Sequence, residues 1–295
     1  MAGIFVPWAM EVMLEKDLSY LRYTLNDVYP YDKTQRRFQF DKIVAALATT
    51  DSLRAMQQTW AVLQNKKNSN GYPPVAKDAT MSKNNVTTDK YGIEIDQAIP
   101  LYTKQDQTRP ARYNYDGALV QVHRKTGNFS ECSTTNFKGN YLIPTKYLKI
   151  IDDSLLFSKV IIVDRHYQNI STFERIGCSW MIRSMNPATT GADKTVYQRP
   201  TPLGLFVLQQ KVYRMYYYKD GTKDIDGYAP YANRFCQGAY IHGVPVNLPE
   251  TEMIEYSPTL GTYPRSHMCV RNATSHAKFI YDHFPAYQSL IFVIE

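Results

Sequence analysis

Two short segments near the C-terminus hold the residue types that a cysteine-based acyl-transfer site requires. Residues 266–272 read SHMCVRN and include Cys269, and residues 241–243 read IHG, with His242 at their centre. A free thiol has a pKa of about 8.5, so a nucleophilic cysteine at neutral pH needs a nearby base or positive charge. His242 and His267 could provide it. The pattern therefore predicts a nucleophile, Cys269, activated by a histidine.

The neighbours of these residues could complete the site. The hydroxyl of Ser266 and the backbone amides around Met268 and Cys269 could orient a histidine and stabilise an oxyanion. The other histidines lack such a context, and we expect them at the surface or in packing, with His276 at most near the site: His123, His166, His276 and His283.

Residues 154–295 have mainly β-strand character, which would position the two segments. Strands are predicted from runs of β-branched and aromatic residues at 159–163, 204–208, 211–218, 239–241 and 290–294. The fourth of these places His242 at a strand end. After the cysteine, apolar residues at helical spacing predict a short helix within 273–283.

Three different compositions precede this region. Apolar residues recur at helical spacing through residues 1–67 and predict an N-terminal helical segment. Residues 68–91 are poor in large apolar residues and predict a linker. Residues 92–152 contain short strands and predict a small β-barrel. The closing segment of that barrel, 139–148, resembles the last strand of bacterial Src-homology-3-like modules, which dock cell-wall peptides or pack on a catalytic domain.

Four motifs in the right order across residues 155–295 resemble the YkuD-type L,D-transpeptidases. That family reads His-Gly, a spacer, then Ser/Thr-His-Gly-Cys-hydrophobic-Arg/Asn, to which residues 242–243 and 266–272 correspond. Residues 201–206 (TPLGLF) resemble the family's Thr-Pro-x-Gly-x-Phe segment, and the strand ending before Asp164 resembles its opening strand. The resemblance implies a mainly β catalytic domain, a YkuD-like β-sandwich with short helices, at 154–295. With the barrel and helical segment before it, the chain would be a multidomain α+β protein.

The resemblance also implies a reaction on peptidoglycan stem peptides. Cys269 would attack the carbonyl of a diaminopimelate residue, release the terminal D-alanine and form a thioester. An amine would then resolve the thioester, giving a diaminopimelate-diaminopimelate (3-3) crosslink or attaching another amine. His242 would be the general base, His267 the second active-site histidine, and Ser266 the hydroxyl that orients the site.

Four further residues are assigned to substrate or oxyanion binding in this comparison, namely Gly243, Met268, Arg271 and Asn272. Arg271 would bind a substrate carboxylate or brace the loop. Met268 stands where the family has glycine, a residue that permits positive φ or close backbone approach. We therefore expect an oxyanion loop that is arranged differently or an acyl site that is narrowed.

Two other functions fit the same residues. An L,D-carboxypeptidase would hydrolyse the same thioester with water, and a non-catalytic protein would bind the cell wall through the barrel. A cysteine peptidase of the NlpC type is disfavoured, because its cysteine precedes its histidine whereas His242 precedes Cys269 here.

Charge and composition limit the partners. The formal charge is +7 and the pI is about 9.0, but the basic residues are scattered, so nucleic acid is not expected. The sequence contains no run of about 18 apolar residues, so no membrane span is predicted. The four cysteines have no zinc spacing, and we expect no cofactor or metal and at most one disulfide. We expect a bacterial extracytoplasmic monomer whose export signal or lipid anchor is not part of this sequence.

Overall fold

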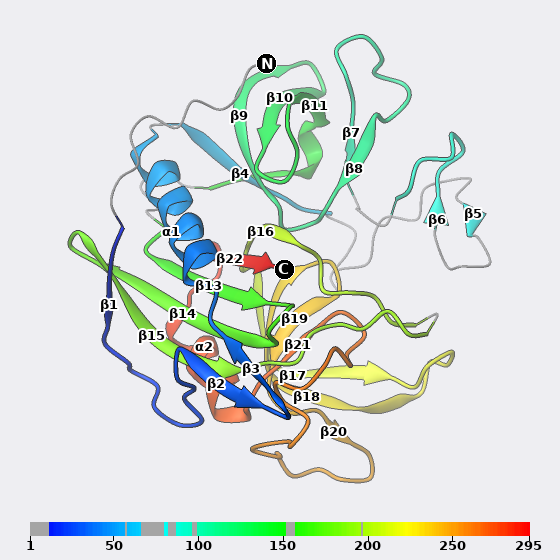
Figure 1. Ribbon diagram of the computed structural model, residues 1–295. Coiled ribbons are helices and arrows are strands. Elements are labelled where there is room, and N and C mark those ends of the chain that lie inside the picture. Colours follow the sequence, from blue (N-terminus) through cyan, green and yellow to red (C-terminus); the bar gives the residue numbers. More distant parts are fainter. Residues whose placement is uncertain are drawn as a thin grey trace.

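The protein is described by a computed structural model over residues 12–56, 58–65, 80–81, 87–95, 99–151, 157–195 and 197–295. Strands dominate these residues, so the predicted mainly β fold is confirmed (Figure 1). In chain order the elements are β1 (Met13–Lys16), β2 (Val28–Tyr31), β3 (Thr34–Arg37), α1 (Phe40–Ala55), β4 (Thr59–Leu63), β5 (Thr80–Met81), β6 (Thr87–Thr88), β7 (Ile99–Leu101), β8 (Arg112–Asn114), β9 (Leu119–Thr126), β10 (Phe129–Thr134), β11 (Asn140–Pro144), the 3-10 turn η1 (Thr145–Tyr147), β12 (Leu148–Ile150), β13 (Lys159–Asp164), β14 (Asn169–Ile176), β15 (Ser179–Pro187), β16 (Gly204–Val207), β17 (Gln210–Tyr218), β18 (Ile225–Cys236), β19 (Ala239–His242), β20 (Val246–Asn247), β21 (Val270–Arg271), α2 (Thr274–His283) and β22 (Ser289–Ile294).

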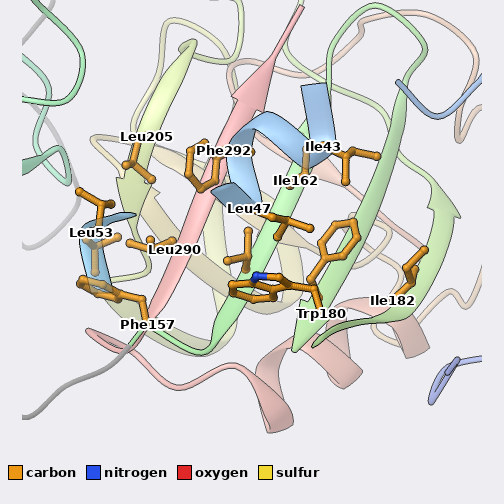
Figure 2. Packing of buried hydrophobic residues seen from close by; sticks show 14 of the residues in the cluster. Ile43, Leu47, Leu53, Phe157, Ile162, Trp180, Ile182, Leu205, Leu290 and Phe292 are labelled. Atoms are coloured by element: carbon orange, nitrogen blue, oxygen red, sulfur yellow. The ribbon is translucent and has the colours of Figure 1, made fainter. Parts of the chain in front are cut away.

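A six-stranded sheet in the order β1-β15-β14-β13-β22-β16 forms the centre of the larger half of the molecule, which also contains α1, α2 and the sheet β17-β18-β19-β21. Its two middle strands, β13 and β22, run parallel and read KVIIVD and SLIFVI. Both are buried on both faces, which explains why they lack polar alternation. One face is covered by α1, so that Ile43 and Leu47 pack against Ile162 and Trp180 (Figure 2).

The other face of this sheet packs against a second sheet in the order β17-β18-β19-β21. Ile161 and Ile291 point to this side, where they join a cluster with Phe235, Ile241 and Ile280. Because Ile280 belongs to α2, the helix after the cysteine closes the end of the same core. The predicted strands of this half and the predicted helix after the cysteine are all confirmed.

A third sheet, five-stranded and in the order β11-β10-β9-β4-β12, packs beside the first two and has its own core. It occupies much of the predicted barrel segment 92–152, but β4 comes from residues 59–63, before that segment. The backbone of Gly117 joins this sheet to the larger half, because its carbonyl accepts a hydrogen bond from the N–H of Val207. The likeness to a Src-homology-3 module and the domain bounds stay predictions.

The predicted helical segment 1–67 is wrong for most of its described residues. Only α1 is helical, and β1, β2, β3 and β4 are strands. β1 adds to the edge of the six-stranded sheet beside β15, a contact that spans about half the chain. β2 and β3 form a hairpin in which Asp32 takes a positive φ of 48°, a turn conformation open to aspartate. Tertiary pairing therefore overrides the helical spacing here.

Two remaining expectations concern the linker and the cysteines. Most of the predicted linker 68–91 lies outside the described residues, and its described parts form the short strands β5 and β6. All four cysteines are free. Among the described residues, no helix is both long enough and apolar enough to cross a membrane.

Candidate active site

The pairing of β19 with β21 brings the two chemistry-bearing segments together. The strands run parallel, with Ile241 beside Val270 and His242 beside Arg271. Side chains alternate along a strand, so Cys269 and Arg271 share the face of His242, whereas Ile241 and Val270 point into the opposite core. His242, Cys269 and Arg271 all line one cavity with a volume of about 2140 Å³.

The cavity extends from this strand pair toward the five-stranded sheet. Its lining includes the hairpin of β17 and β18, and also Tyr115 and Phe137 from the region of β8 to β11. Tyr216 and Tyr218 also line it and are more than half exposed, so packing within the sheet does not account for them. These two side chains are therefore accessible to a ligand in the cavity.

The thiol of Cys269 lies against the turn that joins β18 to β19. Its Sγ donates a hydrogen bond to the carbonyl oxygen of Gly238 at 3.5 Å and accepts one from the backbone N–H of Tyr240. Burial raises the pKa of Cys269 to about 11, while the N–H of Tyr240 and the charge of Arg271 act to lower it. No hydrogen bond joins this thiol to His242, although both residues are described.

His242 is a buried, neutral histidine with one defined partner. Its side chain is only 3% exposed, and its Nδ1 lies 2.6 Å from the carbonyl oxygen of Gly243. A carbonyl only accepts, so Nδ1 carries the proton and Nε2 is left with a free lone pair. Burial lowers the pKa of His242 to about 4, and the positive charge of Arg271 acts in the same direction. The ring is therefore uncharged at neutral pH, with Nε2 as its unprotonated nitrogen.

Arg271 holds a positive charge in the cavity. Its backbone bonds to Thr189 through both N–H and carbonyl at 2.8 and 2.9 Å, which fixes the residue at the sheet edge. Its Nε is buried and has no hydrogen-bond partner, and no carboxylate of the described residues forms an ion pair with its guanidinium. Burial lowers its pKa. A carboxylate from outside the chain would satisfy this group.

The loop before the cysteine is fixed by Ser266. Its hydroxyl donates to the carbonyl oxygen of Cys269, and its N–H donates to that of Thr190 at 3.1 Å. Ser266 thus orients the backbone of the cysteine and not a histidine ring. Residues 201–206 also contribute here, because the hydroxyl of Thr201 donates to the carbonyl oxygen of Met268 at 2.8 Å.

Met268 fits without the backbone conformation that glycine would allow. It is not one of the non-glycine residues with positive φ in the described chain. The close backbone approach instead occurs at Gly191, where a Cβ would lie 2.3 Å from the carbonyl oxygen of Arg199 and 2.8 Å from the Cα of Met268. A glycine on the facing segment therefore provides the space.

His267 lies on the outer rim of the cavity. Its side chain is 51% exposed, and Nε2 lies 2.9 Å from Oδ1 of Asp220 at the tip of the β17–β18 hairpin. The two predicted histidines therefore differ in environment, because His242 is buried and His267 is half exposed. Asp220 was not singled out from the sequence, because nothing near it in the chain relates it to the cysteine loop.

Gly243 and Asn272 support the strand pair from behind. The N–H of Gly243 donates to the carbonyl oxygen of Pro230 at 2.8 Å and is not available to an oxyanion. A Cβ at this glycine would lie 2.7 Å from the hydroxyl of Thr274. The N–H of Asn272 donates to the carbonyl oxygen of His242 at 2.9 Å. Both residues therefore brace the site.

The fully buried His276 also stabilises the strand pair β19–β21, through its contact with Asn272. Its Nδ1 lies 3.2 Å from Oδ1 of Asn272 and its Nε2 lies 2.9 Å from the hydroxyl of Ser184. Burial lowers its pKa to about 3. The spacing of four residues between Asn272 and His276, across the start of a helix, is the signal from which the contact could have been found.

Residues 158–291 match the family model of the L,D-transpeptidase catalytic domain, YkuD. These residues include β13 to β21, α2 and the site residues His242, Cys269 and Arg271, but not Tyr115 and Phe137 of the cavity lining. No curated protein matches the chain. Within the described residues, no three His, Cys, Asp or Glu side chains gather where they could hold a metal ion.

Several solved structures are similar to the chain. One is a fused Zn-dependent amidase/peptidase/peptidoglycan-binding domain-containing protein from Clostridium acetobutylicum, with 22% identity, a TM-score of 0.33, and 46% of this chain and 51% of that chain covered. The match thus spans about half of that protein. An L,D-transpeptidase from Mycobacterium tuberculosis has 16% identity, a TM-score of 0.36, and coverages of 61% and 73%. L,D-transpeptidase 3 from the same organism, in complex with a faropenem-derived adduct, has 17% identity, a TM-score of 0.37, and coverages of 60% and 91%.

Proposed function

We propose that the chain is a cysteine-dependent L,D-transpeptidase that acts on peptidoglycan stem peptides outside the bacterial cytoplasm. The observation that carries the proposal is the parallel pairing of β19 with β21 inside residues 158–291, the part that matches the family model. It places the thiol of Cys269, the neutral ring of His242 and the guanidinium of Arg271 on one cavity wall. A nucleophile, a base and an anion-binding group are what acyl transfer from a carboxylate-bearing peptide needs.

Acylation would proceed through these groups. The Sγ of Cys269 attacks the carbonyl carbon of diaminopimelate in the donor stem, and its proton passes to Nε2 of His242. The hydrogen bond from Nδ1 of His242 to Gly243 keeps the ring in the required tautomer. In the free protein the thiol donates to Gly238, so the substrate must draw Sγ toward the ring; such tightening on binding is common. The same proton then leaves with the amine of D-alanine, and a thioester remains.

The second half-reaction restores the free thiol. An amine on the side chain of another stem attacks the thioester, loses a proton to His242 and forms the new amide of a 3-3 crosslink. The backbone amides of Met268 and Cys269 are the proposed donors to the oxyanion of both steps. Arg271, which has no carboxylate partner among the described residues, would bind a free carboxylate of the donor stem.

Covalent labelling of the thiol tests the proposal. Incubation with a carbapenem should add one inhibitor mass to the intact protein, on a peptide that contains Cys269. The variant Cys269→Ser should give no adduct, and Cys178→Ser, which removes an exposed cysteine that does not line the cavity, should label like the parent. Absence of an adduct, or an equal adduct on Cys269→Ser, would rule out the catalytic proposal in favour of wall binding.

Incubation with purified muropeptides separates the two reactions of the thioester. We expect crosslinked dimers together with free D-alanine. Tripeptides and D-alanine without dimers would instead show that water resolves the thioester, as in an L,D-carboxypeptidase.

A further inference from the structure

A buried ion pair connects the segment before β9 of the five-stranded sheet to the β18–β19 hairpin, whose turn lies beside Cys269. Asp116 lies two residues before Ala118, which bridges to β16, and Arg234 lies near the end of β18. Nη1 of Arg234 is 3.0 Å from Oδ2 of Asp116, and the two side chains are 7% and 1% exposed. A pair this deep is weak evidence for stability, because the cost of removing both charges from water offsets much of their attraction.

Arg234 also holds the turn that follows it. Its Nη1 donates to the carbonyl oxygen of Gln237 at 3.4 Å, and its backbone pairs with that of Tyr240 across the hairpin. Gln237 has a φ of +41°, a left-handed conformation that a non-glycine residue adopts only when its surroundings impose it. The ion pair therefore fixes the side chain that stabilises this turn.

The same turn contacts the nucleophile on both sides. The carbonyl oxygen of Gly238 accepts the hydrogen bond from Sγ of Cys269, and the N–H of Tyr240 donates one to it. These are the polar contacts that the structure gives to this sulfur. The position of the turn therefore sets the direction in which the thiol points and the access of water to it.

The backbone at Gly117, before β9, packs closely against the backbone at Phe235 in β18. Gly117 has a φ of +92°, and a Cβ there would lie 1.8 Å from the carbonyl oxygen of Phe235. Nε2 of Gln209 donates to the same carbonyl at 3.1 Å. Asp116 thus approaches the hairpin on a rigid segment, and a shift of that segment would move the hairpin.

We propose that Asp116 is a positioning residue for Cys269: through Arg234 it fixes the turn at Gln237 and Gly238, and so couples the region before the catalytic domain to the orientation of the nucleophile. The proposal rests on the proposed function only in taking Cys269 as the nucleophile.

The test removes the ion pair without leaving a buried charge. The double variant Asp116→Leu/Arg234→Met replaces both charges with apolar groups of similar size, which can preserve stability. A matched control is Asp51→Leu/Arg175→Met, which exchanges another buried ion pair, with side chains 6% and 12% exposed, between α1 and β14. Both are made in a Cys178→Ser background, so that this exposed thiol does not react.

Two rates are measured on each folded variant, with circular dichroism and the unfolding temperature as checks of the fold. The first is alkylation of Cys269 by iodoacetamide as a function of pH, followed by peptide mass spectrometry. The second is acylation by a carbapenem. Burial raises the pKa of this thiol more than the N–H of Tyr240 lowers it, so exposure of Sγ by a loosened turn should lower the midpoint of alkylation by about one pH unit even though that hydrogen bond is lost. Misplacement of Sγ should slow acylation by about 10- to 100-fold.

If Asp116 positions the thiol, the variant should be alkylated at lower pH but acylated more slowly. A general loss of stability would not move the two reactions in opposite directions. The control variant should change neither rate. Unchanged rates in the folded Asp116→Leu/Arg234→Met variant, or equal changes in the control, would overturn the proposal. If the parent protein is not acylated at all, the proposed function fails, and the alkylation midpoint alone still decides whether Asp116 positions the thiol.

Discussion

The strand pair β19–β21 and the loop at residues 266–268 line the same cavity, yet they hold their histidines in opposite ways. His242 is buried, is kept neutral and bonds only to a backbone carbonyl. His267 is half exposed and bonds to a carboxylate from the tip of another hairpin. Both histidines belong to the same sequence signature. Membership of the signature therefore does not assign the role, whereas burial and the identity of the partner do.

The difference has a chemical consequence. A base that takes a proton from a thiol must offer a free lone pair, and the ring of His242 has one on the strand face that it shares with Cys269. The ring of His267 uses Nε2 on Asp220, so its contact ties the cysteine loop to the β17–β18 hairpin across the cavity. We therefore propose that the inner histidine, His242, transfers the proton and that the outer one, His267, holds the cavity wall.

The largest effect should come from removal of the inner base. In His242→Asn the amide nitrogen can replace Nδ1 as donor to the carbonyl of Gly243, while nothing replaces Nε2. We expect carbapenem acylation to slow by about 100- to 10,000-fold, as for loss of a general base. Stopped-flow fluorescence with intact mass spectrometry measures the rate. A loss below about tenfold in a variant that unfolds at the parent's temperature would contradict the assignment of His242.

The buried histidines also make the fold sensitive to acid. The pKa of His242 is lowered to about 4 and that of His276 to about 3, whereas both rings titrate near 6.5 when unfolded. Between these values the unfolded chain binds protons that the folded chain cannot, so stability is complete above pH 6.5 and falls as the pH drops toward 3. The loss should be on the order of a few kcal/mol.

Urea unfolding at pH 7.5 and at pH 5 measures this loss. His242→Asn should reduce the difference between the two values, because one of the two buried rings is gone. His267→Gln, at the exposed position, should leave it unchanged. Equal stability of the parent protein at both pH values would show that the buried rings are not held neutral, and would remove the contrast between the two histidines.

Sequence reasoning succeeded where the local pattern and the fold agree. The runs at β13 and β22 are apolar throughout because both faces are buried, so the strands can be recognised without knowledge of their partners. Likewise, His242 lies at the end of the predicted strand, and α2 follows the cysteine as expected. The order of reactive residues in the chain was enough to propose a nucleophile and its base.

It failed where structure depends on distant contacts. Leu14 and Leu18 have helical spacing, but they pack on the core of the six-stranded sheet because β1 pairs with β15, more than 160 residues away. The partners of the site residues were missed for the same reason. Asp220 and Gly191 come from segments that only the fold brings to the cysteine loop, and Asp116 comes from a segment that the fold brings to Arg234.

The smallest effect should come from the outer histidine, and it is the sharpest test of the comparison. His267→Gln places an amide nitrogen near the position of Nε2, so the contact with Asp220 can persist, whereas His267→Ala removes it. Exposed pairs of this kind contribute little, and we expect carbapenem acylation to change by no more than about threefold in either variant. Asp220→Asn serves as the matched change on the other partner and should behave alike. A loss in His267→Ala as large as that in His242→Asn, not shared by Asp220→Asn, would show that the exposed ring itself takes part in proton transfer.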